Sequence, residues 1–190
     1  PGGLLCPMDG LAVSFGREVS DFVLRHHELF SSAVDMPLGN VRPLIPLNID
    51  PPKHGTYRKI LDPLFAPRRM DAIEGDVAAR ANEFIDTFVD DGECNFSEQF
   101  AEMYRSAVFL TLMGLPMDLL ETMLGLRDGI LHPEKFDPQA LVDPMARFDV
   151  LNATGLKVYD FFNEHLDARE AAPGDDILTQ FITAEVDGHT

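Results

Sequence analysis

The sequence has few cysteines, no tryptophan and a deficit of positive charge. Only Cys6 and Cys94 occur in 190 residues, and their sequence contexts differ. We therefore expect no disulfide framework, and we predict a cytoplasmic location, where thiols stay reduced. The 15 Lys and Arg residues are outnumbered by 32 Asp and Glu residues, which gives a net charge of −17. Because like charges repel phosphates, a nucleic-acid partner is not expected.

The sequence also lacks a long hydrophobic run. The longest near-continuous apolar stretch, residues 107–117, is about 11 residues long, whereas a membrane-spanning helix needs roughly 20, so we expect no membrane association. There is no CxxC, GxGxxG, HExxH or Walker-type motif, which removes the common signatures of zinc and nucleotide sites. Apolar residues still make up 45% of the chain, enough for a sizeable core, and the length suits one domain or a piece of a larger one.

Helical patterns dominate the remaining sequence. A helix capped by Asn95 or Ser97 and reaching Leu112 is apolar nearly all round, so we predict that it is central and buried. Leu11–Phe15 is the single strand candidate. The other predicted helices cover residues 18–30, 51–65, 69–91, 117–131, 139–170 and 176–185. The predicted class is therefore mainly α, with at most a small β element near the N-terminus.

The loop between residues 31 and 48 is unusually apolar. It contains Val41, Leu44, Ile45 and Leu47 close together, whereas loops that face water seldom concentrate aliphatic side chains in this way. We interpret these residues as covering another part of the molecule or lining a site, and not as facing water alone.

Positive charge is concentrated in the passage "IDPPKHGTYRKILDPLFAPRRM". From Lys53 to Arg69, five basic residues stand against one acid, so this segment is positive within an acidic chain. Asp50 is predicted to cap a helix, with Pro51 at the first helical position, where its missing N–H has no cost.

One edge of this helix carries His54 and Arg58. At about 100° per residue they lie one turn apart, at the border of an apolar face that includes Leu61 and Phe65. An arginine at the edge of a core requires an anion. That anion is either a nearby carboxylate, in a structural ion pair, or a carboxylate of a bound ligand.

The outer edge of the same segment carries four basic residues, Lys53, Lys59, Arg68 and Arg69. They form either a patch that binds an acidic partner or a solvated helix face.

Four passages resemble one protein family, and they occur along this chain in the same order as in that family. "DPPKHGTYRKILDPLFAPRRM" resembles helix C of soluble bacterial cytochromes P-450, whose pattern is His, three residues, Arg and a proline–aromatic ending. "AVSFGREVSDFVLRHHELFSS" resembles the early strand and helix B. "GECNFSEQFAEMYRSAVFLTLMGLP" closely resembles helix E of the camphor-hydroxylating branch, and "GDDILTQFITAEVDGHT" resembles helix H and the following turn. The resemblance implies the helix B to helix H portion of the cytochrome P-450 fold.

The resemblance also implies a cofactor. In that family the helix C His and Arg bind the propionates of haem b (iron protoporphyrin IX), which implies these roles for His54 and Arg58. The family's Cys-ligand loop, the Glu-x-x-Arg of its helix K and the acid–threonine pair of its helix I are missing from the passages that carry the resemblance. We expect them beyond Thr190, so residues 1–190 are interpreted as a single partial domain that supplies no catalytic residue or metal ligand and is inactive alone.

Substrate and redox partners follow from the same resemblance. Residues 41–47 correspond to the loop over the distal pocket, and residues 131–138 correspond to the lid over the substrate entrance. The expected substrate contacts are Leu44, Ile45, Leu47 and Leu131. The basic patch of Lys53, Lys59, Arg68 and Arg69 corresponds to the face on which an acidic iron–sulfur ferredoxin docks.

The function implied by the resemblance is haem-dependent monooxygenation. One oxygen atom from O2 would enter a small apolar substrate, for example a terpenoid, with electrons from an NAD(P)H-dependent reductase through the ferredoxin. Peroxide in place of the redox partner is an alternative within the family. From the residues alone, a non-catalytic all-α ligand-binding or interaction domain also remains open.

Overall fold

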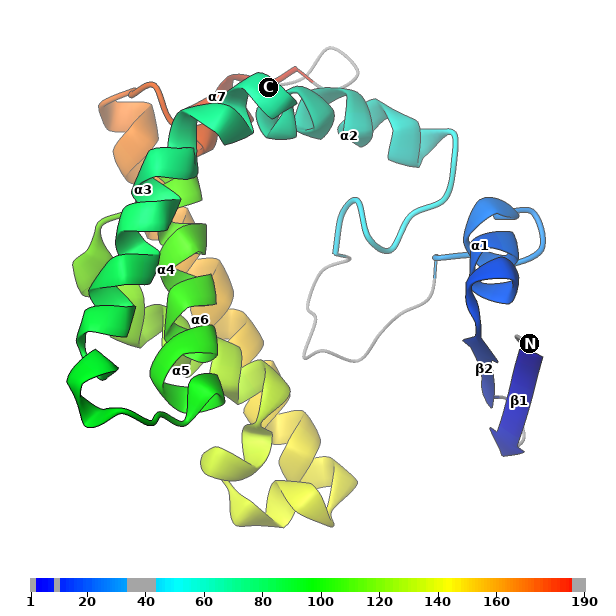
Figure 1. Ribbon diagram of the computed structural model, residues 1–190. Coiled ribbons are helices and arrows are strands. Elements are labelled where there is room, and N and C mark those ends of the chain that lie inside the picture. The colour runs from blue at the N-terminus through cyan, green and yellow to red at the C-terminus, as the bar shows by residue number, and fades with distance from the viewer. Residues whose placement is uncertain (1–2, 9–10, 34–43, 186–190) are drawn as a thin grey trace. The chain divides into compact units, whose positions relative to one another are not determined.

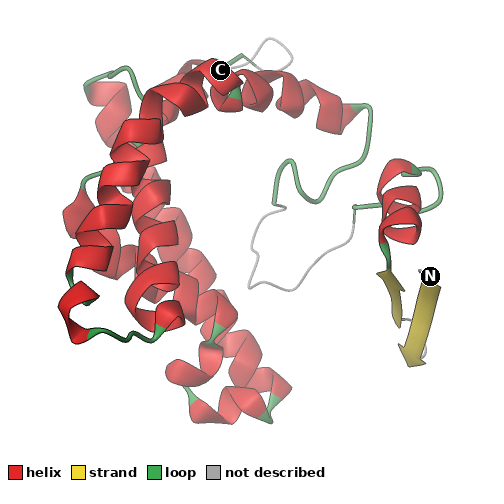
Figure 2. Cartoon of the chain, in the orientation of Figure 1, coloured by secondary structure: helices red, strands yellow, loops and turns green. Residues whose placement is uncertain are grey.

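A computed structural model describes residues 3–8, 11–33 and 44–185 (Figure 1). The chain divides into two compact units. The described residues of the first are 3–8, 11–33 and 44–58, and those of the second are 59–185. Helices account for most of the described chain, and the strands lie near the N-terminus (Figure 2). Among the described helices, none has the length and apolar character that crossing a membrane requires. The mainly α class predicted from the sequence is confirmed.

The first unit begins with a small antiparallel sheet. Strand β1 (Gly3–Met8) pairs with β2 (Leu11–Phe15), and Gly3 lies opposite Phe15. The β2 strand was predicted. The β1 strand was not, because its sequence has no polar–apolar alternation and contains a proline, and proline lacks the N–H that a ladder uses.

Helix α1 (Arg17–Arg25) follows the sheet and is shorter than predicted. The predicted end at Phe30 is wrong, because the chain turns after Arg25. There Nδ1 of His26 lies 2.7 Å from the carbonyl oxygen of Phe22. The His26 ring also stacks on the Phe22 ring, with 4.1 Å between the ring centroids. A local side-chain bond of this kind competes with continued helix.

The boundary between the units falls within helix α2 (Lys53–Leu61), after Arg58. A 3-10 turn, η1 (Asp62–Phe65), follows directly, because Pro63 cannot donate the next helical hydrogen bond. Helix α3 (Pro67–Asp86) then starts with proline at its first position. The long helix predicted to reach residue 91 instead ends at Asp86 and is followed by the 3-10 turn η2 (Val89–Asp91).

The second unit is a helical bundle built around α4 (Glu102–Met113). In Figure 1, α4 lies between α3 and α5 (Leu120–Leu131), and α5 also packs on α6 (Pro144–Ala171). Leu110 of α4 has no exposed surface. The buried core comprises Leu64, Leu110, Met113, Leu115, Leu126, Phe161, Ile177 and Leu178. The predicted central position of this helix is confirmed.

Polar caps and glycines mark the helix ends in this unit. Asn95 accepts a hydrogen bond from the Glu98 amide at the start of η3 (Phe96–Ala101), a π-helical turn that leads into α4. Gly114 ends α4 at φ 69°, a left-handed conformation that favours glycine. Asp143 caps α6, so that helix starts later than the predicted residue 139.

The remaining connections are short. Between the long helices lie η4 (Met117–Leu119), η5 (Pro133–Lys135) and η6 (Pro138–Leu141). Helix α7 (Ile177–Thr183) follows α6 and is capped by Asp176. It is shorter than the predicted helix over residues 176–185.

Helices α5 and α6 approach each other closely at Gly129. A Cβ atom placed there would lie 3.0 Å from Thr154 Cβ and nearer still to its Oγ1, whereas a Cβ at Gly125 meets nothing within 4 Å. We therefore predict that Gly129→Ala lowers the free energy of unfolding by about 1–3 kcal/mol. The matched variant Gly125→Ala should raise it by up to about 1 kcal/mol. Urea unfolding measures both, and equal effects would contradict the close approach.

Candidate functional site

Helix α2 places His54 and Arg58 one turn apart. Tyr57 and Leu61 on the same helix are half-buried. His54 is also half-buried, whereas Arg58 is exposed. One helix thus presents a ring N–H and a guanidinium within one turn, and both of these groups bind carboxylates well.

The predicted helix cap at Asp50 is wrong. The helix starts at Lys53, and the Asp50 carboxylate instead accepts hydrogen bonds from Ser31 Oγ at 2.5 Å and the Ser32 amide at 2.8 Å. A cap would satisfy amides two or three positions later, and one of these belongs to Pro52, which has no N–H. The Ser31 hydrogen bond, with that of Ser32, holds the pKa of the Asp50 carboxyl below its usual value.

The predicted substrate contacts lie in both units. Leu44, Ile45 and Leu47 belong to one turn of the first unit, closed by a hydrogen bond from the Asn48 amide to the Leu44 carbonyl at 2.7 Å. Leu44 is half-buried, while Ile45 and Leu47 are 45% and 69% exposed. Leu131, at the end of α5 in the second unit, is 54% exposed. Val41 lies outside the described residues.

Three of the four predicted partner-binding residues are exposed. These are Lys53 and Lys59 of α2 and Arg68 of α3. Arg69 is half-buried, and its guanidinium donates a hydrogen bond to the side chain of Gln180 in α7. Its placement therefore differs from the outward one expected from the sequence.

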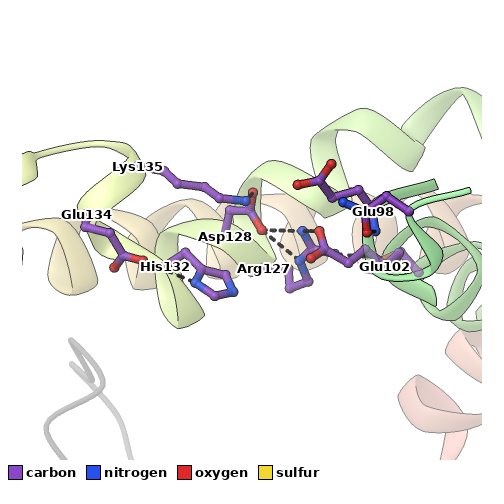
Figure 3. Close-up of polar contacts among 9 residues, drawn as sticks. Glu98, Glu102, Arg127, Asp128, His132, Glu134 and Lys135 are labelled. Atoms are coloured by element: carbon purple, nitrogen blue, oxygen red, sulfur yellow. Dashed lines mark hydrogen bonds and ion pairs between the residues drawn. The ribbon is translucent and has the colours of Figure 1, made fainter. Parts of the chain in front are cut away.

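An ion network that the sequence did not indicate joins α4 to α5. Figure 3 shows Arg127 bonded to Glu102 and Asp128, with Lys135 close to Asp128. The Arg127–Glu102 distance is 2.8 Å, the Lys135–Asp128 distance is 2.7 Å, and the Arg127 side chain is only 12% exposed. The Arg-Asp dipeptide was a possible signal, but Glu102 lies 25 residues away in sequence.

The loop after α5 carries a second pair. His132 Nδ1 lies 3.2 Å from a carboxylate oxygen of Glu134 (Figure 3). The pKa of the Glu134 carboxyl lies below its usual value through a backbone hydrogen bond within the residue itself, with the His132 contact adding to it. Among the described residues, no group of three His, Cys, Asp or Glu side chains is arranged to hold a metal.

The contribution of the ion network to the free energy of unfolding is predicted to depend on pH. Burial alone would raise the pKa of Asp128, but hydrogen bonds from Lys135 and Arg127 outweigh it and hold the pKa below its usual value. The stabilisation is therefore complete above the unfolded-state pKa of about 4 and is lost as the pH falls through the folded-state pKa. Asp128→Asn should lower the free energy of unfolding by about 1–3 kcal/mol at pH 7 and by less in acid.

Urea unfolding at pH 7 and below pH ~4 measures this dependence. The matched control is Glu121→Gln, which removes an exposed acid from the same helix and should change stability little at either pH. An Asp128→Asn effect of the same size at both pH values would contradict the assigned role.

Comparisons with known proteins identify the family. No protein-family model matches the chain. A probable cytochrome P-450 of Sinorhizobium fredii is 31% identical over 166 residues, which is 87% of this chain and 36% of the relative. A steroid C26-monooxygenase of Mycobacterium tuberculosis is 27% identical over 95% of this chain and 47% of the relative.

A solved structure agrees with these relatives. The crystal structure of CYP101J2 superposes on all of this chain with a TM-score of 0.75 at 26% identity, and the match covers 45% of that protein. The chain therefore spans between about a third and a half of the length of the proteins that it matches. Sequence and fold together show that the chain belongs to the cytochrome P-450 family and corresponds to part of its fold.

Proposed function

We propose that this chain is part of a haem-dependent monooxygenase that inserts one oxygen atom from O2 into a small apolar substrate. The observation that carries the proposal is the pairing of His54 and Arg58 one turn apart on α2, in a chain of the cytochrome P-450 family. A relative named as a steroid monooxygenase supports the reaction class. The chain matches less than half the length of each of these relatives. We therefore assign the activity to a longer polypeptide that includes this chain.

The donors on α2 fit the carboxylates of haem. The propionates are two anions on a rigid ring, and His54 with Arg58 offers two charge-assisted hydrogen-bond donors on one rigid helix. When bound, haem supplies the oxygen chemistry, and the protein supplies position and electrostatics. In this proposal His54 and Arg58 orient the ring, while the axial Cys lies outside residues 1–190.

The spectrum of the reduced longer protein with CO tests this proposal. A Soret band shifted strongly to the red is expected, because a thiolate ligand changes the electronic structure of the iron. Residues 1–190 alone should not give this band. A longer protein that binds no haem, or binds it without the shift, would contradict the proposal.

The proposed substrate contacts are Leu44, Ile45, Leu47 and Leu131. The exposure of Ile45, Leu47 and Leu131 supports this assignment, since large apolar side chains gain most when a ligand covers them. A terpenoid suits aliphatic contacts of this kind, and the steroid named for one relative is also apolar. Spectral titration with a terpenoid should show tight binding that Leu47→Asn weakens. Unchanged affinity would remove Leu47 from the site.

The proposed redox partner is an acidic ferredoxin in the cytoplasm, reduced by an NAD(P)H-dependent reductase. Lys53, Lys59, Arg68 and Arg69 form the proposed docking patch of an otherwise acidic chain. The exposure of the first three supports it, and opposite charge accelerates association.

Charge reversal of this patch is predicted to act on electron delivery alone. Lys53→Glu with Lys59→Glu should slow ferredoxin-driven turnover by about 10-fold or more at low salt, because steering is lost, and should spare peroxide-driven turnover. The matched control is Lys157→Glu, an exposed lysine on α6, which should change neither rate. Equal loss in both assays, or loss in neither, would contradict the docking role.

A further inference from the structure

Asp50 connects two segments of the first unit through both of its carboxylate oxygens. Oδ2 accepts from the Ser31 hydroxyl at 2.5 Å and Oδ1 accepts from the Ser32 amide at 2.8 Å. The Ser31 oxygen in turn accepts from the Ala33 amide at 3.0 Å. The segment that follows α1 is therefore hydrogen-bonded to Asp50, three residues before the start of α2.

The backbone of the same residue supports the first turn of α2. The Asp50 carbonyl accepts from the His54 amide at 3.1 Å, and the Pro52 carbonyl accepts from the Gly55 amide at 3.0 Å. Pro51 and Pro52 have no N–H, so they donate nothing that would fix this turn. Asp50 is thus fixed at two points. Its carboxylate is bonded to Ser31 and Ser32, and its backbone carbonyl is bonded to the amide of His54.

The charges around Asp50 favour this arrangement. The pKa of its carboxyl is lowered first by the Ser31 hydroxyl, then by the Ser32 amide, and further by attraction to His27 and His54. The carboxylate is therefore ionised at neutral pH, the state in which both oxygens accept. Hydrogen bonds to an ionised group are stronger than those between neutral groups.

We propose that Asp50 is a positioning residue, which sets the direction of His54 toward its anionic ligand by anchoring the start of α2 to Ser31 and Ser32. Asp50 itself touches no ligand and acts through His54. The inference rests on the proposed function, because the anion in question is a haem propionate. It adds a residue whose carboxylate is hydrogen-bonded to the segment that follows α1.

Two measurements test the position of His54. In the haem-free longer protein, Asp50→Asn should speed amide hydrogen exchange in the peptide that contains His54 by roughly 10-fold, because the anchor loses its charge and one acceptor. In the haem-loaded protein, the same variant should speed haem transfer to an acceptor globin several-fold. Asp21→Asn, which removes an exposed acid from α1, is the matched control and should change neither rate.

A double-mutant cycle separates positioning from general destabilisation. Ser31→Ala removes one donor to the same carboxylate, so it should reproduce part of both effects, and the Asp50→Asn/Ser31→Ala pair should be less than additive. Additive effects, or a lower unfolding temperature with unchanged exchange and haem transfer, would overturn the inference.

The two proposals fail in different ways. If the unsubstituted protein binds no haem, the proposed function fails. If it binds haem and Arg58→Ala weakens binding while Asp50→Asn does not, the positioning role alone fails.

Discussion

Replacement of Arg58 by alanine should weaken haem binding by roughly 10- to 100-fold in the longer protein. A charge-assisted hydrogen bond to a carboxylate contributes about 1.5–3 kcal/mol, and each 1.4 kcal/mol is a factor of ten in affinity. Arg58 is exposed on α2, so its loss should not disturb a packed core. The rate of haem transfer to an acceptor globin measures the change.

The adjacent residue provides the control. Lys59→Ala removes one positive charge from the same helix, one residue further along, and should leave haem transfer unchanged while it slows electron delivery. Arg58→Lys should recover part of the affinity, because it restores the charge but not the two-pronged geometry. Equal haem loss from Arg58→Ala and Lys59→Ala would show that net charge, and not a directed contact, holds the cofactor.

Replacement of Arg127 by methionine should lower the free energy of unfolding by about 2–3 kcal/mol. The substitution leaves the carboxylates of Glu102 and Asp128 without their shared partner. The Arg127 side chain is 12% exposed and that of Asp128 is 17% exposed, so water replaces the lost hydrogen bonds poorly. The expected loss is less than for a fully buried pair, because Glu102 is 32% exposed.

Arg80 provides the matched comparison for this network. It pairs with Glu83 at 2.5 Å on α3, where the two side chains are 34% and 60% exposed. Exposed pairs of this kind contribute roughly 0–1 kcal/mol, so Arg80→Met should cost far less than Arg127→Met in urea unfolding. Similar losses from the two variants would contradict a structural role for the network.

Local patterns were sufficient to predict most of the helices. The buried residues of α4 recur at helical spacing. The Asn95 cap lies directly before η3, the turn that leads into this helix. The β2 strand also followed from its own sequence. Features of this kind depend on neighbours within a few residues, which a single sequence displays directly.

Contacts between distant residues were not predictable in the same way. Asp50 has the sequence context of a cap, yet its partner is 19 residues away at Ser31. Arg69 was predicted to lie on the outer edge of its helix, yet its partner, Gln180, is 111 residues away. Without the packing of the helices, the sequence could not show which polar groups would meet.

The candidate site also combines local features, which the sequence indicated, with a contact between distant residues, which it did not. The spacing of His54 and Arg58 is local, so the sequence alone indicated that they would lie one turn apart on a helix, and the structure places both in α2. Their ligand was implied by the family resemblance, not by the spacing. The anchoring role of Asp50 required the structure, because it depends on the segment that contains Ser31 and Ser32.

The most direct test of the account is an experimental structure of the longer protein with haem. A ring nitrogen of His54 and the guanidinium of Arg58 should each lie about 2.7–3.2 Å from propionate oxygens. Haem propionates held by other side chains, with His54 and Arg58 turned away from the ring, would contradict it.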